Sequence, residues 1–145
     1  MDREGYPSKP FGFDLCTRIV FVHQAFSLAV LTAGLTQTIA RGNLIHILST
    51  SAGLLIAIAA ACAMFIVVRK KSLQALIFLH LILWIAVAKA AIGTFSVFGA
   101  GGSMATDSLR SMLLNEAVLI PLAIYWSRPV HREYLVSRNH CQQVQ

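Results

Sequence analysis

Two ionisable residues, Lys89 and Glu116, lie inside apolar stretches that are long enough to cross a lipid bilayer. A charged group at membrane depth is costly and usually faces a partner or a cavity. With a rise of about 1.5 Å per residue, Lys89 lies roughly 7 Å to the outer side of the centre of its stretch, and Glu116 lies near the centre of its own. These depths predict an intramembrane ion pair. The alternative is a proton or cation site, with the neighbouring Asn115 bonded to a further helix.

Two histidines, His23 and His80, form a second candidate site, because each lies on the cytoplasmic side of the centre of its apolar stretch. Their estimated distances from those centres are roughly 9 Å and 7 Å. If the two helices are diagonal in a bundle, the imidazoles could be the axial ligands of a b-type haem. The simpler hypothesis is that each neutral histidine hydrogen-bonds to a neighbouring Ser or Thr. We therefore expect no bound cofactor and keep haem b as the alternative.

Motifs for hydrolytic or group-transfer chemistry are absent from the sequence. It contains no glycine-rich phosphate loop, no Gly-x-Ser-x-Gly and no paired carboxylates on one helix face. The cysteines, Cys16, Cys62 and Cys141, are odd in number and lack metal-ligand spacing, so the sequence predicts no metal site. These patterns predict no catalytic residues and argue against an enzyme, although they do not decide the question.

The composition indicates the elements that must position these residues. Of the 145 residues, 57% are hydrophobic and 12% are charged, whereas a soluble domain has about 25% charged residues. The mean hydropathy is +0.68. We therefore predict an all-α polytopic membrane protein, an antiparallel bundle of four transmembrane helices spanning residues 18–127. The expected spans are 18–40, 44–68, 72–97 and 108–126, preceded by an arm over 1–17 and followed by a polar tail over 128–145.

Positive charge predicts the orientation, because loops rich in Lys and Arg stay in the cytoplasm. Nine Lys and Arg residues flank one side of the spans, and only Arg41 and Arg110 flank the other. Both termini are therefore predicted to be cytoplasmic. The net charge of +6 is explained by these topology signals, so we expect the lipid bilayer and no nucleic acid as a partner. The nine residues are Arg3, Lys9, Arg18, Arg69, Lys70, Lys71, Arg128, Arg132 and Arg138.

Small residues recur every four positions in the first and second spans. Such stripes let helix backbones approach closely, and they predict a compact bundle. His80 and Lys89 are nine residues apart and so about 180° apart around one helix, which suggests that a second helix surface is covered by another copy of the chain or another membrane subunit. The stripes are Ser49, Gly53, Ala57 and Ala61 in the second span and Ala25, Ala29 and Ala33 in the first.

Several short segments in the second half of the chain resemble a family of uncharacterised four-span bacterial inner-membrane proteins, known only as a domain of unknown function. The resemblance implies four spans and a bacterial inner-membrane location, and it implies no activity. The segments are Arg69-Lys70-Lys71, Arg110, Ile120-Pro121, Ser127-Arg128 and Val130.

These observations predict a small non-catalytic subunit or accessory protein of a larger membrane assembly. Two alternatives stay open. One is a haem-bearing electron-transfer anchor that uses His23 and His80, and the other is a small proton- or ion-coupled transporter that uses Lys89 and Glu116.

Overall fold

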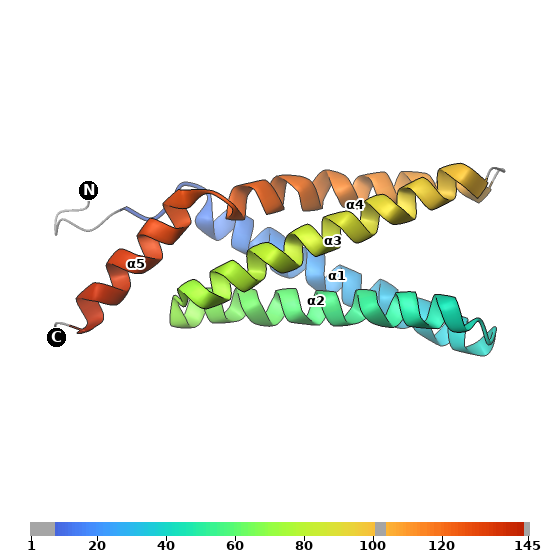
Figure 1. The fold of residues 1–145 in the computed structure, drawn as a ribbon, viewed down its shortest axis with the longest axis horizontal. Helices are drawn as coiled ribbons and strands as arrows, with labels where there is room; N and C mark the ends of the chain where they lie inside the picture. Colours follow the sequence, from blue (N-terminus) through green and yellow to red (C-terminus); the bar gives the residue numbers. More distant parts are fainter. Residues whose placement is uncertain (1–7, 101–103, 144–145) are drawn as a thin grey trace.

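The computed structural model describes residues 8–100 and 104–143, and the described part is all-helical (Figure 1). The all-α prediction is confirmed for this part of the chain. In chain order the helices are α1 (Phe13–Ala40), α2 (Leu44–Lys70), α3 (Leu73–Ala100), α4 (Met104–Trp126) and α5 (Pro129–Gln143).

Short, locally encoded turns join the first three helices. The predicted turn at 41–43 lies between α1 and α2, with Gly42 in the left-handed region at φ 66° and the Asn43 side chain accepting a bond from the His46 amide (3.3 Å). At the end of α2, Lys71 also has a positive φ of 49°, and the Ser72 hydroxyl accepts a bond from the Ala75 amide (3.3 Å). Because these connections are short, the helices that they join must lie side by side and run antiparallel.

The helices form two hairpins that share a core at only one end. α1 packs against α2 and α3 packs against α4, while α2 and α3 diverge from the end at which they are connected, and α1 and α4 contact each other in a restricted region (Figure 1). The α1–α2 tip and the α3–α4 tip lie at separate corners of the molecule, and the beginning of α1 and the helix α5 lie at the opposite end (Figure 1). The core is at that opposite end and includes Met64, Leu79, Leu83 and Trp126, each no more than 1% exposed.

Three helices are long and apolar enough to cross a membrane: α1, α2 and the segment 73–95 of α3. Within the residues whose side chains the structure describes, the apolar part of α4, Met112–Trp126, is shorter than these three. The structure thus supports three of the four predicted spans by length and composition.

The small-residue stripes have different environments in the two helices. In α2, Gly53 and Ala57 are buried, Ala61 is half-buried and Ser49 is exposed. The three alanines of the α1 stripe, Ala25, Ala29 and Ala33, are all exposed, so the expectation that this stripe packs inside the bundle was wrong. The half-buried side of α1 instead includes Ser27, Leu31, Gly34 and Thr38, a different face of the same helix.

The tail predicted as polar forms the helix α5, which packs across the core end of the bundle. His131, Tyr134 and Leu135 are buried there, although Arg132 and Glu133 are exposed. Pro129 begins the helix, a position at which proline costs no hydrogen bond. The packed core therefore continues past residue 127 into this helix.

Candidate functional site: polar side chains between the helices

Asn115 of α4 is hydrogen-bonded to α1. The His23 Nε2 lies 2.9 Å from Asn115 Oδ1, and the amide nitrogen of Gln24 lies 3.5 Å from His23 Nδ1. Since the Asn115 oxygen can only accept, His23 donates from Nε2 and its Nδ1 is free to accept from Gln24. Both ring nitrogens of His23 thus have a partner within the chain, and Gln24 is only 4% exposed.

Glu116, one residue further along α4, faces a different helix. Its carboxyl Oε1 lies 2.6 Å from the Thr94 hydroxyl of α3, and Thr94 is 8% exposed. The same hydroxyl lies 3.1 Å from the carbonyl oxygen of Ala90, one turn earlier in α3. Because adjacent residues are about 100° apart around a helix, Asn115 binds α1 while Glu116 binds α3.

Lys89 points toward Gly53 of α2. Its Nζ lies 3.3 Å from the point that a Cβ on Gly53 would occupy, so the glycine leaves room for the ammonium group. Lys89 and Thr94 are five residues apart, which places them about 140° apart around α3. The structure therefore does not bring Lys89 and Glu116 to ion-pair distance. The ion pair formed within the described residues is that of Lys9 with Asp14, at the N-terminal end of α1.

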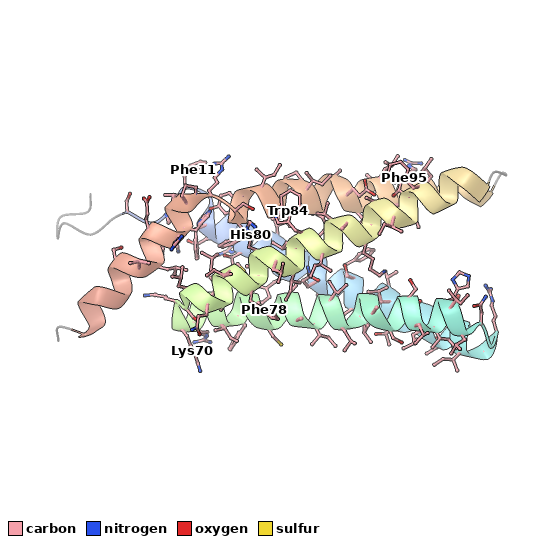
Figure 2. All side chains as sticks on the ribbon, in the orientation of Figure 1. Phe11, Lys70, Phe78, His80, Trp84 and Phe95 are labelled. Carbon is pink, nitrogen blue, oxygen red and sulfur yellow. The ribbon has the colours of Figure 1, made fainter. Side chains whose placement is uncertain are left out.

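His80 and Trp84 of α3, both labelled in Figure 2, contact Ser127, the residue that directly follows α4. Ser127 Oγ lies 2.9 Å from His80 Nδ1, accepts from Trp84 Nε1 at 3.3 Å and donates to the carbonyl of Ala123 at 2.5 Å. A hydroxyl has one proton, so Ser127 accepts from His80 while its own proton stays on α4. With the protons placed in this way, His80, Trp84 and Ser127 link α3 to the end of α4. No neighbouring group is then placed to take the Ser127 proton, so Ser127 is not activated as a nucleophile.

The two candidate haem ligands are each bonded to α4, His23 through Asn115 and His80 through Ser127. Ligation through the bonded nitrogen would require each histidine to give up this contact. Among the residues that the structure describes, no group of three or more His, Cys, Asp or Glu side chains is arranged to hold a metal ion. The haem hypothesis remains a prediction.

An aromatic cluster around His131 has no counterpart in the sequence prediction. His131 is fully buried, with its ring centroid 4.5 Å from Tyr125, 4.9 Å from Trp126 and 6.1 Å from Phe13. Among the described residues, no atom meets full hydrogen-bond geometry with either His131 ring nitrogen or with the Trp126 indole nitrogen, although the Tyr125 backbone lies close enough to act on the imidazole. Burial lowers the pKa of His131, and the charge of Arg128 acts in the same direction, while the Tyr125 backbone acts in the opposite direction.

The sequence contained a signal for this cluster. His131, Tyr134 and Leu135 are spaced i, i+3 and i+4, which is the spacing of one helix face. This signal is easily missed because charged residues separate the three positions and no ligand motif includes His131.

Comparison with protein-family models, curated proteins and solved structures finds no match for this chain.

Proposed function

We propose that this chain is a four-span integral membrane protein that serves as a non-catalytic subunit or accessory protein of a larger membrane assembly. The observation that carries the proposal is the set of bonds made by α4. Asn115 binds α1 and Glu116 binds α3, so polar side chains at membrane depth link helices to one another. Ser127, directly after α4, adds a bond to α3 at the end of the span. Such bonds hold a scaffold in one arrangement.

The exposed apolar surface supports a membrane location. Within the most apolar windows, only 11% of residues are buried in α1, compared with 33% in α2 and 28% in α3. Exposed side chains include Phe26, Ile45, Leu55 and Phe95, between 67% and 78% exposed. If a bilayer or neighbouring subunits cover these faces, their apolar side chains are no longer exposed to water.

The charge distribution supports cytoplasmic termini. The nine flanking Lys and Arg residues belong to the arm, the α2–α3 connection and the tail. Lys70 lies at the same end of the molecule as the beginning of α1 and the helix α5 (Figure 2). Arg41 follows α1 at the tip of the first hairpin, and Arg110 lies near the beginning of α4. We propose the bacterial inner membrane as the location, in accordance with the family resemblance.

The mass of the assembly tests the accessory role. The tagged chain is extracted from its own membranes as lipid-containing particles, and the protein mass of each particle is compared with the 15.8 kDa of a single chain. We expect a fixed ratio to further copies or to a second membrane polypeptide, unchanged when the particles are diluted tenfold. A uniform population of single chains in two mild extraction systems would contradict the proposal. An exposed-residue variant, Thr32→Val, is the matched control and should give the same mass.

A reduced-minus-oxidised absorption spectrum tests the haem alternative. Both ring nitrogens of His23 are bonded within the chain, so we expect a spectrum without Soret, α and β bands. Bands that disappear in both His23→Leu and His80→Leu would instead identify an electron-transfer anchor.

A further inference from the structure

One face of α3 is an exposed apolar stripe that runs along most of the helix. With about 100° of rotation per residue, its members fall within an arc of about 100° around the helix axis. The small residue Ala88 lies between the larger ones and lets a second helix approach closely. The other members of this α3 face are Phe78, Leu81, Ile85 and Phe95, between 46% and 77% exposed, of which Phe78 and Phe95 are labelled in Figure 2.

Two opposite charges flank the α3 face, one on each side. Lys89 directly follows Ala88, so it lies about 100° around the helix in one direction, and it extends toward α2. Thr94 lies about 120° around the helix in the other direction, and its hydroxyl bonds to Glu116 of α4. The α3 face therefore has an ammonium group beside one edge and a carboxyl group beside the opposite edge.

Neither Lys89 nor Glu116 has an oppositely charged partner among the side chains that the structure describes. The Lys89 ammonium lies beside Gly53, and Glu116 Oε1 accepts from the neutral Thr94 hydroxyl at 2.6 Å. A carboxylate can accept further bonds besides this one. Both side chains are half-buried, so each can be reached from outside the chain. Since a lone charge at membrane depth is costly, each group favours a counter-charge from another chain.

The two groups lie at similar depths in the membrane. Thr94, the bonding partner of Glu116, follows Lys89 by five residues, which is a rise of about 7.5 Å along α3. Its side chain tilts back toward the beginning of the helix, and so toward the level of Lys89, because Cα–Cβ bonds in a helix have this direction. The long, flexible stem of lysine can bridge the remaining difference in level.

We propose that a second copy of this chain docks on the α3 face, so that Lys89 of each copy pairs with Glu116 of the other. A twofold axis along the membrane normal keeps every residue at its depth and places one edge of the face opposite the other edge in the second copy. Lipid tails can cover the apolar stripe but supply no counter-charge, whereas a second copy supplies both. The pairing rests on the membrane location and assembly role proposed above, and it identifies one partner within that assembly.

Charge reversal tests the pairing, because the pairing predicts which copies associate. The full chain, with a donor or an acceptor fluorophore at its N-terminus, is reconstituted in phosphatidylcholine vesicles, and energy transfer is measured as the protein is diluted with lipid. We expect Lys89→Glu alone and Glu116→Lys alone each to weaken self-association by about tenfold or more, since each variant places like charges opposite one another. An equimolar mixture of the two variants should associate as tightly as the parent, because both pairs in a mixed dimer again have opposite charges.

A second variant blocks the α3 face without changing a charge, and it decides the question if the reversed variants fold poorly. Ala88→Trp places a bulky side chain at an exposed position and prevents close approach of the second copy, so we expect association to weaken by about tenfold. Ala29→Trp is the matched control, since Ala29 is an exposed alanine of α1. It should leave association unchanged.

Three results would overturn the pairing: parent-like association of either charge-reversed variant alone, a mixture that associates no better than its components, or equal association of Ala88→Trp and Ala29→Trp. The mass of the native particles separates the pairing from the accessory role. Particles with one copy of the chain and one further polypeptide would contradict the pairing while the accessory role stands, and single chains would contradict both.

Discussion

Acidification is expected to release α5 from the end of the bundle, because His131 is fully buried there among aromatic rings. Its ring is enclosed by Tyr125, Trp126 and Phe13, and α5 also packs against α3. Burial lowers the pKa of His131 from its ordinary value of about 6.5. The docked state therefore prefers the neutral ring, and the released state, in which water reaches the ring, accepts a proton more readily.

The direction and the size of the effect follow from this difference in pKa. The stability that neutral His131 contributes is fully present above pH 6.5 and is lost as the pH falls toward the lowered pKa of the docked state. Between these limits, the equilibrium for release rises by up to tenfold for each pH unit, which corresponds to about 1.4 kcal/mol per unit. The positive charge of Arg128 opposes protonation in the docked state as well.

The fluorescence of Trp126 reports the docking, because its ring lies 4.9 Å from His131. Trp84→Phe leaves Trp126 as the single tryptophan, since the chain has two. In nanodiscs we expect a reversible change in emission as the pH is lowered from 8 to 5. His131→Leu removes the titrating group, so the change should disappear.

His46→Leu is the control for histidine content, because His46 is exposed at the α1–α2 turn. It should show the same acid transition as the parent. An acid transition that persists in His131→Leu would refute the reasoning, and so would constant Trp126 emission in the parent over this pH range.

Three further changes test the packing, each measured by reversible unfolding in mixed micelles. Gly53→Leu should destabilise the chain by about 1–3 kcal/mol, because even a Cβ there lies 3.3 Å from a lysine nitrogen, and an unchanged midpoint would contradict this close approach. A double-mutant cycle of His23→Leu and Asn115→Leu should give a coupling energy of about 0.6 kcal/mol, and a value of zero would mean that their 2.9 Å contact does not link α1 to α4. Leu83→Ala, at a fully buried position, should cost about 2–5 kcal/mol, whereas Leu55→Ala, 67% exposed, should cost far less; equal costs would place the core elsewhere.

The helical character of the chain could be predicted from local features. Apolar runs of the length of a bilayer predicted the extents of α1, α2 and α3 closely, and the turn at 41–43 was predicted from its glycine and its polar residues. These features depend on residues near one another in the sequence, where backbone geometry and hydropathy act directly. Depth along a helix could be estimated for the same reason, since each residue adds a constant rise.

The sequence by itself therefore determined an all-helical chain with membrane-length apolar segments, whereas only the tertiary structure decided which polar side chains meet. Depth says nothing about rotation around a helix axis, so Lys89 and Glu116 could be placed at similar levels and still face α2 and α3 separately. The same limit applies to α5. Its apolar side chains are spaced for a helix face, but burial of His131 depends on the ends of α1, α3 and α4 converging there, which is a property of packing between distant segments.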